Sequence, residues 1–119
     1  MLLLKNILNT SKNLFSEDNG FSISETHHIE KKDSPSGTAL DLQRAIISIY
    51  PEANVVIESF REGNNPGEHT VGITLDKEIL EFTHRAEDRS IFALGALKGA
   101  VWLTKRSAGF YSMGDIYTS

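Results

Sequence analysis

The stretch Glu25-Thr-His-His-Ile-Glu-Lys-Lys-Asp-Ser-Pro-Ser-Gly-Thr38 contains adjacent histidines, two lysines and a Ser-Gly-Thr step. An apolar–polar alternation leads into it and predicts a strand over about residues 21–28. A helical pattern follows it to about Ser48, with Leu40, Ala45 and Ile46 among the candidate core positions. The stretch is therefore predicted to join a strand to a helix N-terminus, which is a common place for an anion to bind.

The start of that helix is marked by Ser34-Pro35-Ser36-Gly37-Thr38. Proline has a fixed φ and no backbone donor, so Pro35 fits the first helical turn. Either Ser34 or Ser36 could be the N-cap, and the pattern does not choose between them. The Ser36-Gly37-Thr38 step then presents free backbone N–H groups beside a hydroxyl, although an ordinary helix cap is the commoner meaning of such a tripeptide.

The other periodic segments predict an α+β fold. An amphipathic helix is expected over about residues 2–14, and a long helix capped by Asp88 over about residues 89–106. Strands are expected at residues 54–60, 69–75 and 78–84, the last two as a hairpin, and the tail after Gly109 as a short edge strand. We expect a four-stranded mixed, mostly antiparallel sheet with helices on one face and one βαβ-type crossover, in a single domain over residues 1–119.

Composition narrows the classes of function. The chain has 119 residues, a formal net charge of −4 and no cysteine. Disulfides and thiolate metal sites are therefore excluded, and the acidic balance argues against non-specific nucleic-acid binding. The apolar run at the N-terminus is too short for a membrane helix. From the charge and this short run together, we expect neither nucleic acid nor a membrane as a partner.

Several titratable side chains gather near the end of the first predicted strand. His27 and His28 are adjacent, so they point to opposite faces of the sheet and are expected to have different roles. A histidine can transfer a proton near neutral pH, and Lys31 or Lys32 could neutralise a carboxylate. A solvated charged loop is the alternative interpretation.

Two further groups of residues could form sites. The possible metal ligands are Glu25, His27, His69 and His84. They show neither an HExxH motif nor paired i,i+4 spacing, so we expect no metal site. The last two histidines are better explained as strand residues in hydrogen bonds. Arg89 could meet an anionic ligand or pair with a neighbouring acid, and Phe92 could be part of the core.

The motif Glu25-x-His27-His28-x-x-Lys31-x-Asp33-x-Pro35-Ser36-Gly37-Thr38-Ala39 resembles the signature of the dihydrodipicolinate reductases (4-hydroxy-tetrahydrodipicolinate reductases) of the diaminopimelate route to lysine. Essentially the whole chain shares the resemblance, through Arg61-x-Gly63-x-x-x-Gly67-x-His69, His84-x-Ala86-x-x-Arg89, Phe92-Ala93-x-Gly95-Ala96, Trp102-Leu103 and residues 109–115. The sequence contains no glycine-rich strand–helix fingerprint of a dinucleotide-binding domain. It is therefore similar to the C-terminal, substrate-binding and oligomerisation domain alone.

The resemblance implies specific roles. His27 takes the general acid/base position, delivering a proton to the substrate ring as hydride arrives from NADPH or NADH, and Lys31 takes the position of the catalytic lysine. Contact with the dicarboxylate substrate is implied for His28 and, at one carboxylate, for Ser36, Gly37 and Thr38. Positions near the nicotinamide are implied for Arg89 and Phe92.

The resemblance also implies a cytoplasmic homotetramer that associates through its sheets. Without a cofactor domain, we expect this chain alone to be inactive and to bind no nicotinamide cofactor tightly. The competing hypothesis is a non-catalytic oligomeric scaffold or carboxylate-binding module from a truncated gene.

Overall fold

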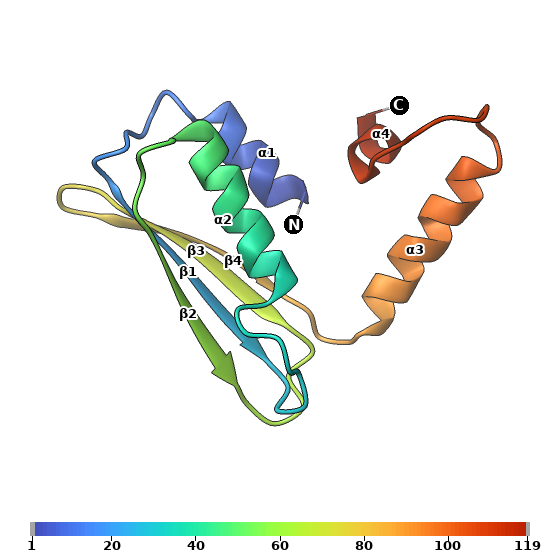
Figure 1. Ribbon diagram of the computed structural model, residues 1–119, viewed down its shortest axis with the longest axis horizontal. Coiled ribbons are helices and arrows are strands. Elements are labelled where there is room, and N and C mark those ends of the chain that lie inside the picture. Colours follow the sequence, from blue (N-terminus) through green and yellow to red (C-terminus); the bar gives the residue numbers. More distant parts are fainter. Residues whose placement is uncertain (1, 119) are drawn as a thin grey trace. The chain divides into compact units, whose positions relative to one another are not determined.

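The computed structural model describes residues 2–118 and forms two compact units. Leu3–Glu87 contains the sheet with two helices, and the second unit, which begins at Asp88, contains two more. The elements in chain order are α1 (Leu2–Thr10), β1 (Gly20–His27), α2 (Gly37–Ile49), β2 (Val55–Arg61), β3 (Glu68–Thr74), β4 (Ile79–Arg85), α3 (Ser90–Leu103) and α4 (Met113–Thr118) (Figure 1).

The sheet has the strand order β2-β1-β3-β4. β1 and β2 are parallel and are connected through α2, whereas β3 is antiparallel to both β1 and β4. α1 and α2 cover the same face of this sheet (Figure 1). The predicted mixed sheet, its crossover, its hairpin and the one-sided helix layer are therefore confirmed.

The core lies between that face and the two helices. In one row across the sheet, Ile23 of β1 is aligned with Ile57, Val71 and Phe82 of the other strands. The buried residues that the helices contribute are Leu4, Leu8, Ala39, Leu42 and Ile46. The next inward positions of β1 are ionisable, because alternation places Glu25 and His27 on the same face as Phe21 and Ile23. The apolar core therefore ends where a polar cluster begins.

The start of α2 resolves one prediction and corrects two. Ser36 is the N-cap, since its hydroxyl accepts a hydrogen bond from the Ala39 N–H at 3.1 Å. Pro35 precedes the cap, so the prediction that it occupies the first helical turn was wrong. Leu40 is 36% exposed and is not a core position, because the buried stripe runs through residues 39, 42 and 46.

The helix predicted over residues 2–14 ends earlier, at Thr10. The chain then continues in turns, with hydrogen bonds from Ser11 N to Ile7 O and from Leu14 N to Ser11 O. No described helix has both the length and the apolar character needed to cross a membrane.

In the second unit, Arg89 is the N-cap of α3 and makes no side-chain cap bond, so the prediction that Asp88 caps this helix was wrong. The Asp88 carboxylate does accept a hydrogen bond from the Ser90 N–H at 2.8 Å, just before the helix. The expected edge strand in the tail was wrong, because residues 113–118 form α4. At its start, the Asp115 carboxylate accepts hydrogen bonds from the Ser112 N–H at 2.7 Å and from the Ser112 hydroxyl at 3.1 Å. Local capping outweighed the apolar composition that suggested a strand.

Replacing Leu42 with alanine should lower the free energy of unfolding by about 2–5 kcal/mol, because this fully buried side chain would leave a cavity beneath α2. Leu40→Ala on the same helix is the matched control, and its side chain is 36% exposed. Urea denaturation followed by circular dichroism measures both. Equal losses in the two variants would contradict the assignment of the core face.

Candidate functional site

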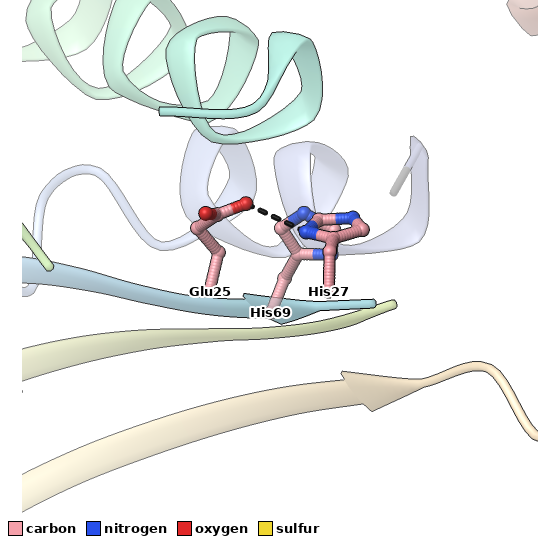
Figure 2. A group of neighbouring side chains, drawn as sticks. All are labelled: Glu25, His27 and His69. Carbon is pink, nitrogen blue, oxygen red and sulfur yellow. Dashed lines mark ion pairs between the residues drawn. The ribbon is translucent and has the colours of Figure 1, made fainter. Parts of the chain in front are cut away.

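Two ionisable side chains occupy the carboxyl end of β1. Glu25 and His27 are two residues apart, so both stand on the helix-covered face, and they are 1% and 8% exposed. Figure 2 shows them side by side, with His27 Nδ1 only 2.7 Å from Glu25 Oε2. A histidine and a carboxylate are thus paired at the edge of the apolar core.

Arg61, the last residue of β2, holds the other oxygen of that carboxylate. Its Nη1 donates to Glu25 Oε1 at 2.5 Å, and its Nη2 donates to the backbone oxygen of Asp33 at 2.6 Å. Burial by itself would raise the pKa of Glu25, but hydrogen bonds from Arg61 and Ser36 and the nearby charge of His27 outweigh burial and lower that pKa. Glu25 is therefore a buried carboxylate that stays ionised.

His69 connects this pair to the start of α2. It lies opposite Glu25 in the β1–β3 register and is 5% exposed. Its Nε2 is 3.2 Å from Ser36 Oγ, and its ring packs edge-on against His27 with centroids 5.0 Å apart. The expectation that His69 is a strand histidine in a hydrogen bond is confirmed.

Burial also acts on both histidines. It lowers the pKa of His69 to about 4, and the neighbouring charge of His27 adds to the effect. It lowers the pKa of His27 as well, although Glu25 partly opposes this by favouring the imidazolium. His69 is consequently neutral at pH 7, which allows it to hydrogen-bond the cap hydroxyl without burying a second cation.

The cluster of Glu25, His27 and His69 also has the composition of a metal site. One ligand atom from each lies within 4.8 Å of the others. The positive charge that a metal would supply is already provided by the Arg61 guanidinium. The arrangement therefore fits a polar network better than a metal centre.

The remaining predicted substrate residues lie in the crossover between β1 and α2. Lys31 is half-buried, with its Nζ 3.1 Å from Asp33 Oδ1, and its charge helps to lower the pKa of His27. Gly37 is exposed with open space around it, and Thr38 is half-buried beside it at the start of α2. His28 is half-buried and, by alternation, points away from His27.

The two predicted cofactor residues belong to the second unit. Arg89 immediately precedes α3, and Phe92 lies in its first turn with 55% of its side chain exposed. Their placement near a nicotinamide stays a prediction.

Sequence reasoning gave no site role to Arg61 or Gly67. Arg61 continues the inward positions of β2 after Ile57 and Ser59, so strict alternation was the signal that could have placed it beside Glu25. Gly67 has a φ of +144°, and a Cβ added there would lie 3.1 Å from His27 Nε2. Only the folded chain reveals that approach.

The sequence is similar to known proteins over nearly its whole length. Residues 1–117 match the family described as dihydrodipicolinate reductase, C-terminus. This chain belongs to that family. It is 46% identical over 94 residues to the 4-hydroxy-tetrahydrodipicolinate reductase of Thermosipho africanus, covering 79% of this chain and 41% of that protein. The reductase of Wigglesworthia glossinidia brevipalpis is 39% identical over 117 residues, covering 96% of this chain and 42% of that protein.

A solved structure supports the fold. The dipicolinate-bound dihydrodipicolinate reductase from Paenisporosarcina sp. TG-14 is similar with a TM-score of 0.68 at 19% sequence identity, covering 81% of this chain and 42% of that chain. At this identity the likeness concerns the fold. The chain spans less than half the length of each of these relatives.

Acidification should destabilise the unit that contains the sheet. The folded pKa of His69 is about 4 against an ordinary value of 6.5, so between these values the unfolded state binds more protons. Stability is therefore complete above pH 6.5 and is lost as pH falls toward 4, by at most roughly 3 kcal/mol from this residue.

Urea denaturation from pH 7 to pH 4 measures this loss, and His69→Gln should flatten the pH dependence. His28→Gln, which removes a histidine outside the buried network, is the control. The assignment fails if His69→Gln and the wild type have parallel stability curves.

Proposed function

We propose that this chain is the substrate-binding and oligomerisation part of a 4-hydroxy-tetrahydrodipicolinate reductase acting in cytoplasmic lysine biosynthesis. The observation that carries the proposal is the placement of His27, a buried histidine paired with a carboxylate, at the same end of β1 as the crossover to α2. Family membership supports the same conclusion. The reaction requires a proton donor and a carboxylate-binding group, and the family motif contains candidates for both.

His27 is the proton donor in this proposal. NADPH or NADH, when bound to the complete enzyme, supplies the hydride. His27 delivers the accompanying proton to the substrate ring. Its lowered pKa makes the imidazolium a readily donating acid. Lys31 places a positive charge near His27, in the crossover that leads to α2, where it can attract a negatively charged substrate.

One carboxylate of the substrate is bound at the N-terminus of α2. The first-turn N–H groups of Gly37 and Thr38 have no acceptor within the helix, and the helix dipole favours an anion there. Ser36 is buried, and its hydroxyl already accepts a hydrogen bond from the Ala39 N–H and contacts His69. Ser36 therefore fixes the start of α2 and does not itself bind the ligand. Thr38 is then the side chain that offers a hydroxyl to the ligand. The dipicolinate-bound relative supports a pyridine dicarboxylate as the probe.

Assembly as a homotetramer through the sheet is the remaining part of the proposal. Within the first unit, the face opposite α1 and α2 carries no helix (Figure 1). Val56, Phe60 and Ile79 are 52%, 44% and 63% exposed, and alternation places them on that face. Pairing of such faces would remove these apolar side chains from water.

The 119-residue chain should bind pyridine-2,6-dicarboxylate weakly. Thr38→Val and Lys31→Ala should each weaken binding, because one removes a hydroxyl and the other a positive charge at the proposed anion site. Isothermal titration calorimetry measures the dissociation constants, with Thr83→Val on β4 as the control. Unchanged affinity in both site variants would refute the carboxylate assignment.

The chain alone should not oxidise NADPH or NADH in the presence of substrate. Fusion to the N-terminal part of the Thermosipho africanus reductase should give an active hybrid, in which His27→Gln lowers kcat by ~10²–10⁴-fold. Steady-state nicotinamide absorbance measures both, with His84→Gln as the control. Turnover by the isolated chain would contradict the proposal that another part of the enzyme must bind the cofactor. A folded but inactive hybrid would favour the non-catalytic scaffold.

Sedimentation equilibrium should show a tetramer. Phe60→Glu on the uncovered face should shift the distribution to smaller species, because it introduces a charge into the proposed interface. Glu62→Gln in the exposed loop after β2 is the control. A wild-type monomer at all concentrations would rule out assembly through this isolated chain.

A further inference from the structure

We propose that Glu25 is a positioning residue that holds a proton on Nδ1 of His27, which makes Nε2 the nitrogen that exchanges a proton with the substrate. Arg61 in turn holds Glu25 in place. The proton exchange with the substrate rests on the proposed function, whereas the assignment of the His27 tautomer rests on contacts within this chain.

Donor and acceptor chemistry determines which nitrogen of His27 carries the proton. Glu25 Oε2 and His27 Nδ1 lie 2.7 Å apart, and both atoms are buried (Figure 2). In the part of the chain that the structure describes, neither Nδ1 nor Oε2 makes a hydrogen bond of good angle, so the two atoms form a close ion-pair contact and Nδ1 has no other partner. An ionised carboxylate can only accept, so a lone pair on Nδ1 would face another lone pair at this distance. The proton therefore belongs on Nδ1 in the neutral ring.

Glu25 stays ionised and oriented. Arg61 donates to its other oxygen at 2.5 Å, and the same guanidinium is anchored to the backbone of Asp33. Arg61 is aligned with His27 in the β1–β2 register and holds Oε1 of the carboxylate, while Oε2 faces Nδ1.

On the opposite edge of the ring, Nε2 and Cδ2 of His27 face Gly67, where a Cβ would lie 3.1 and 3.3 Å from these atoms. Glycine also suits the backbone φ of +144° at this position. With no side chain at residue 67, the Nε2 edge keeps its space while the Nδ1 edge is occupied by Glu25.

The charges around His27 then define how the pair should titrate. Glu25 on β1 raises the pKa of His27, whereas Lys31 in the crossover and Arg61 on β2 lower it. His69 on β3 contacts the ring and is neutral above pH 4. Glu25 is therefore the one acidic neighbour among these groups, and neutralising it should move the pKa of His27 downward.

Nitrogen-15 NMR of the labelled 119-residue chain tests the proposal without any activity measurement. Two-bond proton–nitrogen correlations distinguish the two neutral tautomers, and the His27→Gln variant identifies the His27 signals. At neutral pH the wild type should show His27 with its proton on Nδ1. A wild-type spectrum with the proton on Nε2 would overturn the proposal, whether or not any variant folds.

Glu25→Gln provides the second readout. It keeps the shape of the side chain, and His27 should then populate both tautomers and titrate at a lower pH. Glu58→Gln on the same sheet is the matched control, because Glu58 is exposed and lies on the other face. A folded Glu25→Gln protein with an unchanged His27 tautomer and pKa would refute the role of Glu25.

The outcome is separable from the proposed function. If the wild type holds the Nδ1–H tautomer but fails to bind pyridine-2,6-dicarboxylate, the positioning role stands and the substrate assignment falls. If it binds the dicarboxylate while His27 carries its proton on Nε2, the substrate assignment stands and the positioning role falls.

Discussion

The buried contact between Glu25 and Arg61 is the interaction on which the arrangement of this site depends. An isolated carboxylate in the interior costs several kcal/mol, and losing one partner of a buried pair typically costs about 3–5 kcal/mol. The contact joins β1 to β2, and the second arm of the Arg61 guanidinium reaches the backbone of Asp33 in the crossover. One guanidinium therefore connects two strands to the loop that leads into α2.

A second chain of contacts reaches the same helix from β3. His69 lies beside His27 and contacts Ser36, whose hydroxyl caps α2 through the Ala39 N–H. The helix N-terminus and the paired histidine are thus positioned by the same buried network. A neutral His69 suits this position, because it can bond the hydroxyl without adding a charge beside His27.

The sheet register makes this network possible. The rows through Phe21 and Ile23 are apolar, and the next row aligns Glu25 with Ser59 and His69. A one-residue slip of β1 would turn both Glu25 and Ile23 to the uncovered face, so the core and the polar cluster specify the same register. Stability and the geometry of the candidate site consequently share one constraint.

The sequence by itself determined the order of the elements in the first unit. Strand boundaries fell within one residue of those observed, since alternation, the hairpin and the crossover are local patterns. The family motif also singles out His27, Lys31 and the Ser36-Gly37-Thr38 step as candidate site residues, and their roles stay predictions. Local capping was harder to weigh against composition, which is why α4 was mistaken for a strand.

Only the tertiary structure decided which atoms of those residues meet. Arg61 is 36 residues from Glu25 in sequence, and no local pattern specifies a hydrogen bond across parallel strands. The same applies to His69 at Ser36 and to Gly67 at the Nε2 edge of His27. A sequence lists ionisable groups, but pKa values, tautomers and partners depend on burial and distance, and these exist only after the strands have paired.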